Sequence, residues 1–117
     1  MSSYNHYLQG KAIQTGCEWR LKFKIISEAL ESFPPSAKFV AHVRDTYDGP
    51  LKAELTTENG RVIRVSGNEL ELVLPAEVTK NWEAGKVVMD VIRTDLTQPI
   101  HLGFDLEIPV KRSVTRL

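Results

Sequence analysis

The sequence predicts an all-β protein, and three observations support this. Apolar and charged residues alternate through 17–25 and again through 100–110, which is the pattern of a strand with one face on a core and the other in water. Tight-turn sequences such as Asp48-Gly49-Pro50 and Ser66-Gly67-Asn68 separate the alternating stretches. The stretches are short and closely spaced. Together these features are typical of an antiparallel sandwich or barrel of seven or eight strands.

Each expected strand follows from its own alternation or apolar run. In chain order, we expect strands at 7–14, 17–26, 38–45, 51–57, 61–66, 69–74, 86–94 and 100–110. Asn59-Gly60 lies between the fourth and fifth of these strands, and this pair is preferred in two-residue hairpins. The last strand and the N-terminal segment are expected at sheet edges, where unpaired backbone groups are available to another chain.

Two segments have helical features. Residues 75–82 are expected to form one turn, because Pro75 suits the first helical position and Glu77 places an acid in the first turn. Gly85 is expected to end that turn. Residues 27–32 could also form a turn of helix before Pro34-Pro35 stops it.

The alternation also predicts which side chains form the core. Cys17 begins one apolar row and is expected to be a small core residue. The rows predicted to face inward are Trp19, Leu21, Phe23 and Ile25; Leu102, Phe104 and Leu106; Phe39, Ala41 and Val43; and Val87, Met89 and Val91, the last backed by Val88 and Ile92.

Composition excludes several classes of protein. A chain of 117 residues fits a single domain, 1–117. Fifteen basic and fifteen acidic residues give a net charge of zero, which argues against a nucleic-acid partner. No apolar stretch approaches the roughly 20 residues of a membrane span, and the N-terminus has no signal-peptide pattern. The single cysteine excludes an internal disulfide and a cysteine-based zinc site.

The order of features from Leu55 onward resembles a family of small phage and prophage structural proteins. Leu72-Val73-Leu74-Pro75-Ala76 precedes Thr79, then Ala84-Gly85 and Met89-Asp90-Val91, and the chain ends in Val114-Thr115-Arg116. The resemblance covers roughly residues 10–116 and extends to the N-terminal domain of phage baseplate upper proteins. It departs at Val87, where the family usually has an aromatic residue, and at 33–37, where it often has Leu-Thr-Gly.

That resemblance implies an immunoglobulin-like β-sandwich with a structural role. The expected function is protein–protein contact in a tail, baseplate or neck, with other virion proteins as partners and a homo-oligomer as the expected state. The expected location is the virion, or the host cytoplasm during assembly. The alternatives are a carbohydrate-binding module that aids host attachment and, more remotely, a small regulatory protein that inhibits a host factor.

Candidate catalytic and metal residues each have an ordinary structural explanation. His6, His42 and His101 lie in polar stretches with no second histidine two positions away. Asp105 and Glu107 share one strand face, about 7 Å apart, near the spacing of glycosidase carboxylates. A solvated strand face is the better explanation, because a small sandwich has little room for a deep cleft. Asp90, in an apolar strand, is expected to pair with Arg44, Arg93 or a backbone donor.

We therefore expect that the chain is not an enzyme and that it has no catalytic residue, no cofactor and no metal. No glycine-rich phosphate loop and no nucleophile elbow is present in the sequence. A sugar-binding platform would need two or three aromatic residues on one exposed face. Trp19 is expected in the core, and Trp82 is expected either to cap the core or to be exposed. Tyr4 and Tyr7 lie near the N-terminus, and Tyr47 lies near a turn.

Overall fold

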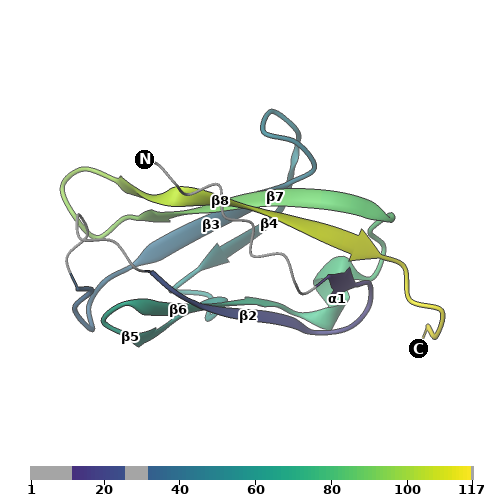
Figure 1. Cartoon of the computed structure of the whole chain (residues 1–117), viewed down its shortest axis with the longest axis horizontal. Coiled ribbons are helices and arrows are strands. Elements are labelled where there is room, and N and C mark those ends of the chain that lie inside the picture. The colour runs from purple at the N-terminus through teal and green to yellow at the C-terminus, as the bar shows by residue number, and fades with distance from the viewer. Residues whose placement is uncertain (1–11, 26–31, 117) are drawn as a thin grey trace.

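The computed structural model describes residues 12–25 and 32–116 (Figure 1). Within these residues the elements are, in chain order, β1 (Ile13–Gln14), β2 (Trp19–Lys24), β3 (Phe39–Arg44), β4 (Leu51–Thr56), β5 (Val62–Ser66), β6 (Glu69–Leu74), α1 (Ala76–Thr79), β7 (Gly85–Arg93) and β8 (Ile100–Lys111). The all-β prediction is confirmed. Residues 7–11 of the first expected strand and 27–31 of the second helical turn lie outside the described residues.

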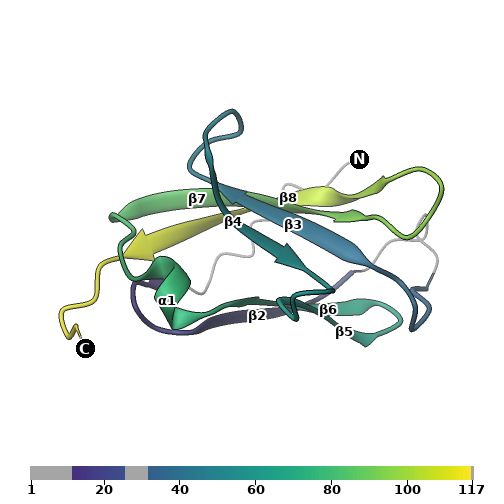
Figure 2. The same cartoon turned by 180° about the vertical axis from the view of Figure 1, so that it is seen from behind.

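The strands form two facing sheets that enclose one core (Figures 1 and 2). One sheet has the order β1-β8-β7-β3-β4 and the other has the order β2-β6-β5. Every pair is antiparallel except β1 with β8, which is parallel. The five-stranded sheet is therefore mixed, and the expectation of an entirely antiparallel fold is wrong at this one pair. β1 and β8 can pair in parallel because they lie far apart in the sequence and are not joined by a hairpin.

One local expectation is wrong. Asn59-Gly60 closes no hairpin, because β4 and β5 belong to different sheets and this turn carries the chain from one to the other. The Asn59 side chain holds the turn: its Oδ1 accepts hydrogen bonds from Thr56 N at 2.9 Å and Arg61 N at 3.0 Å. The expected edge at the N-terminal segment and the last strand is present in part: β1 is an outer strand, and it pairs with β8 only at Val110 and Lys111, so the rest of β8 keeps an open edge among the described residues.

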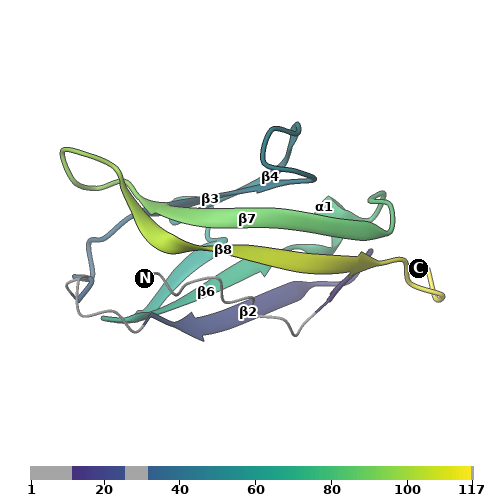
Figure 3. The ribbon, with the colours of Figure 1, turned by 45° about the horizontal axis from the view of Figure 1, so that its top comes forward.

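The inward rows are confirmed, although three of their residues are only half-buried. Trp19, Phe39 and Leu106 are almost fully buried, whereas Leu21, Ile25 and Phe104 are half-buried against the same core. The Phe104 ring meets that of Phe23 edge-on, with centroids 5.2 Å apart, so β8 and β2 touch across the layers (Figure 3).

The prediction that Cys17 belongs to the buried row is wrong. Its side chain is an exposed free thiol, not a core residue. The apolar alternation continues back to residue 17, but β2 begins only at Trp19. Cys17 therefore lies in the turn after β1, where strand alternation no longer decides which way a side chain points.

The expected helical turn is present and shorter than predicted. Pro75 is the N-cap residue, Lys80 is the C-cap, and Gly85 opens β7 instead of ending the helix. The buried Thr79 joins α1 to the β1–β2 turn, since its hydroxyl accepts a hydrogen bond from Gly16 N at 3.0 Å. No helix of the described residues is long and apolar enough to cross a membrane.

Candidate functional site

The outer face of the five-stranded sheet carries a line of titratable side chains across four adjacent strands. Glu54 of β4 lies opposite His42 of β3, His42 opposite Asp90 of β7, and Asp90 opposite Asp105 of β8. Their strand neighbours Ala41, Val43, Met89 and Val91 are buried, so these four side chains point away from the core. We call Glu54, His42, Asp90 and Asp105 the polar row.

A bulge in β8 adds His101 to this row. Asp90 pairs with Asp105 and Ile92 pairs with His101, so the single residue Val91 of β7 faces three residues of β8. Gly103 lies in the bulge with φ of 90°, a conformation that favours glycine. The His101 Nε2 atom lies 3.0 Å from Asp90 Oδ2 and 3.8 Å from Asp105 Oδ1.

Hydrogen bonds assign the tautomer of His101. The backbone N–H of Gly103 donates to His101 Nδ1 at 2.9 Å, so Nδ1 is the acceptor and the ring proton is on Nε2. Nε2 then donates to Asp90 Oδ2 at 3.0 Å. In this arrangement the His101 ring lies within 4 Å of both carboxylates.

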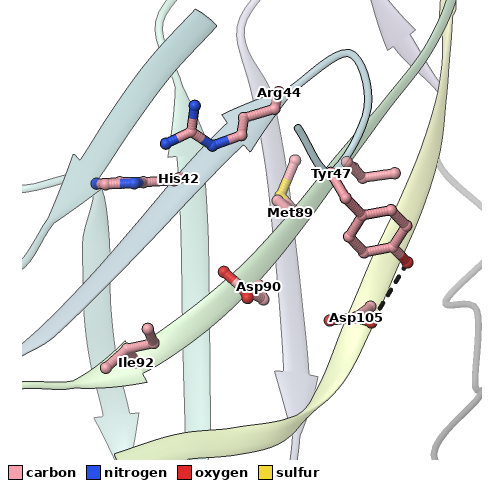
Figure 4. A pocket seen from close by; sticks show the side chains of 8 residues that line it. His42, Arg44, Tyr47, Met89, Asp90, Ile92 and Asp105 are labelled. Atoms are coloured by element: carbon pink, nitrogen blue, oxygen red, sulfur yellow. Dashed lines mark hydrogen bonds between the residues drawn. The ribbon is translucent and has the colours of Figure 1, made fainter. Parts of the chain in front are cut away.

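The loop between β3 and β4 stands over one end of the row (Figures 2 and 4). The Arg44 Nη1 atom donates to Gly49 O at 2.8 Å and so holds the loop, while the Tyr47 hydroxyl donates to Asp105 Oδ2 at 3.3 Å. A shallow cavity of about 230 Å³ lies below the loop. Figure 4 shows Asp90 between His42 and Asp105 on its floor. The lining residues are His42, Arg44, Tyr47, Val88, Met89, Asp90, Ile92 and Asp105.

The loop between β7 and β8 is held by a separate ion pair. The Arg93 Nε and Nη2 atoms donate to the two Asp95 carboxylate oxygens at 2.8 and 3.1 Å, and Lys38 N donates to Oδ1 at 3.2 Å. The bonds from Arg93, helped by the Lys38 N–H, lower the pKa of Asp95 to about 2. This pair ties the residues that follow β7 to Lys38, directly before β3.

The carboxylates singled out in the sequence have other partners than expected. Asp90 pairs with His101, because Arg44 is used by Gly49 and Arg93 by Asp95. The Asp90 side chain is also 39% exposed, so it is not a buried carboxylate. Asp105 and Glu107 do not act together: Asp105 contacts Tyr47 and His101, whereas Glu107 Oε2 lies 3.1 Å from Lys86 Nζ.

The remaining sequence candidates lie apart from the row. Trp19 is buried in the core as predicted. Trp82 is a half-buried cap on the core, and the Lys52 ammonium lies 5.0 Å from its ring centroid. Among the aromatic residues of the described part, Tyr47 alone is exposed as a large hydrophobic side chain. Tyr4, His6 and Tyr7 fall outside the described residues.

Sequence reasoning missed the convergence of Asp90, His101 and Asp105. The sequence was searched only for metal ligands close together on one strand. These three residues come from two strands, and strand pairing and a bulge bring them together. The available signal was that Asp90 and Asp105 both occupy polar positions of consecutive predicted strands. A hairpin between those strands places such positions opposite each other.

No protein-family model matches this chain, and no curated protein matches its sequence.

Proposed function

We propose that this chain is an immunoglobulin-like β-sandwich module that acts through protein–protein contacts in the tail, baseplate or neck of a phage or prophage particle, or during its assembly. The proposal is supported by the order of motifs from Leu55 to Arg116. In the structure the central motif is the corner in which β6 ends, α1 makes one turn and β7 begins. The two facing sheets of five and three strands are compatible with this fold class.

The position of exposed aliphatic side chains favours contact with another protein. β4 and β5 are outer strands of their sheets, and each keeps one side without a strand partner among the described residues. Leu51 in β4, and Ile63 and Val65 in β5, are exposed on these strands, and Ile100 is exposed at the start of β8. An edge strand with apolar side chains is suited to strand addition by a partner.

The carbohydrate-binding alternative has less support. Stacking on a sugar requires several aromatic faces on one exposed surface. Within the described residues Trp19 is buried, Trp82 is covered, and Tyr47 stands by itself over the polar row. We therefore favour protein contact over sugar binding.

Light scattering across a concentration series tests self-association. We expect a mass above that of the 13.2 kDa monomer, and a loss of association in Ile63→Lys or Ile100→Lys, because a charge on an edge strand opposes pairing. Leu96→Lys is the matched control, since Leu96 is equally aliphatic and exposed but lies in a loop. A protein that stays monomeric to millimolar concentration excludes self-assembly and leaves only a heterologous partner.

The phage assignment has a separate test. The genes next to the one that encodes this chain should encode tail or fibre proteins. A neighbourhood without phage structural genes would contradict the assignment, whatever the oligomeric state.

A further inference from the structure

We propose that Asp90, His101 and Asp105 bind a divalent transition-metal ion, with Zn²⁺ as the best match, on the outer face of the five-stranded sheet. Each residue offers one ligand atom, and the three atoms all lie within 4.8 Å of one another. This inference goes beyond the proposed function and does not depend on it.

The spacing of the ligand atoms is close to what a metal ion requires. Zinc binds nitrogen and carboxylate oxygen at about 2.0–2.2 Å, so tetrahedral ligands lie about 3.4 Å from one another. The His101 Nε2 atom is 3.0 Å from Asp90 Oδ2 and 3.8 Å from Asp105 Oδ1. The three side chains are 39–49% exposed, so each has room to rotate toward an ion placed among them.

Electrostatics also favour a cation at this position. Asp90 and Asp105 are directly opposite on adjacent strands, and like charges in that position are destabilising. Within residues 12–25 and 32–116, the only basic side chain in ion-pair distance of either carboxylate is that of His101. Other contacts on this face are complementary: His42 is directly opposite Glu54, and Lys86 Nζ lies 3.1 Å from Oε2 of its diagonal neighbour Glu107. A dication would replace the repulsion between the two aspartates with attraction to both.

The donor set selects the class of metal. An imidazole nitrogen with two carboxylates suits Zn²⁺ and related transition ions, whereas Ca²⁺ takes six to eight oxygens and Mg²⁺ prefers oxygen ligands with retained water. Three protein ligands leave at least one coordination position open. At a surface site, water or a side chain of a partner protein would complete the coordination.

Binding has a structural consequence at Gly103. A metal on Nε2 moves the remaining ring proton to Nδ1, and Nδ1 can then no longer accept the Gly103 N–H. The exposed bulge lets this N–H turn toward water. The amide of Gly103 therefore reports whether the ion reaches His101 Nε2.

The experiment is a titration of the tag-free full chain with Zn²⁺ by calorimetry. It uses a Cys17→Ser background, because the exposed Cys17 thiol binds zinc on its own. We expect one ion per chain with a micromolar dissociation constant, weakened at least tenfold by His101→Gln and by Asp105→Asn. His42→Gln is the matched control: His42 Nε2 lies 3.0 Å from Glu54 Oε2 on the same sheet face, but no third ligand from the described residues joins that pair. We expect it to bind zinc as the parent does.

Several results would overturn the proposal. They are absence of zinc binding to the parent up to millimolar concentration, unchanged binding in His101→Gln, and an equal loss in His42→Gln. Binding of Mg²⁺ or Ca²⁺ as tight as that of Zn²⁺ would also contradict it. Thermal melting of the metal-free variants checks that they fold. The amide spectrum then gives an independent readout, in which the Gly103 resonance moves with zinc in the parent and not in His101→Gln. If the zinc proposal fails in any of these measurements, the light-scattering test of the proposed function is unaffected.

Discussion

Replacing Phe104 by alanine tests which face of β8 is turned toward the core. Removing a fully buried phenylalanine costs about 3–5 kcal/mol, and the alternation alone predicts that range for Phe104. The structure places Phe104 among the half-buried residues packed on the core, so part of the side chain is already in water. We therefore expect Phe104→Ala to cost about 2–3 kcal/mol, below the about 3–5 kcal/mol expected for the fully buried Phe39→Ala.

Part of that cost comes from one aromatic pair. Phe104 and Phe23 meet edge-to-face, with an interplanar angle of 76° and centroids 5.2 Å apart. Such pairs contribute about 0.5–1.5 kcal/mol beyond area burial. A double-mutant cycle of Phe23→Ala and Phe104→Ala should show a coupling energy of that size.

Urea denaturation measures these differences. At an m-value of about 1.5 kcal/mol/M, a loss of about 2–3 kcal/mol lowers the midpoint by about 1.3–2 M. Glu107→Gln, on the outer face of the same strand, should change stability by less than about 0.5 kcal/mol. An unchanged midpoint in Phe104→Ala would refute the inward assignment of Phe104. It would also remove the basis for the polar row, because a shift of one residue turns Asp105 inward.

Three further changes probe the loop between β7 and β8, the polar row and the β8 bulge. The folded-state pKa of Asp95 is about 2, below its ordinary 3.8. The ionised form of Asp95 therefore stabilises the fold above pH 3.8, and this contribution is lost as the pH falls toward 2. Between these pH values the melting temperature should fall less steeply with pH in Asp95→Asn than in the parent, and an identical slope would contradict the assignment. Asp105→Asn in metal-free buffer should leave stability unchanged or raise it by up to about 1 kcal/mol, because a like-charge contact disappears; a loss in denaturant melts would show that the carboxylate is structural. Gly103→Ala should cost about 1–2 kcal/mol from backbone strain alone, since its φ is 90° and an added Cβ meets no atom within 4 Å; equal stability in the same melts would show that the bulge takes another form.

Most of the strand layout could be predicted because strands leave a period-two signal. All of the predicted strand positions in the described residues match observed strands, with ends that shift by a few residues. Pairing was not predictable in the same way. Asn59-Gly60 has the residues of a hairpin turn but joins two sheets, because a turn sequence fixes the local backbone and not which partners the flanking strands find.

The candidate site was less predictable because it depends on register. Alternation correctly placed His42 and Asp105 on polar faces. It contains no information on the number of residues in the β8 bulge, and that number decides whether His101 reaches Asp90. Gly103 was the one local sign, since an isolated glycine within a strand pattern often marks a bulge. Cys17 was wrongly predicted to be buried, because the alternation was followed back beyond Trp19, where β2 begins.

The polar row is where this chain departs from the rules that its other surface strands follow. Opposite charges meet at Lys86 and Glu107, and His42 faces Glu54, so these pairs support the register of their strands. Asp90 and Asp105 oppose that register, and a strained glycine in the bulge adds to the cost. Locally unfavourable arrangements in otherwise consistent proteins are concentrated at functional sites. The same row lies beside a cavity and under an exposed tyrosine. A ligand that compensates the two carboxylates, whether a metal ion or a basic group on a partner, would therefore stabilise the fold and form a contact at the same place.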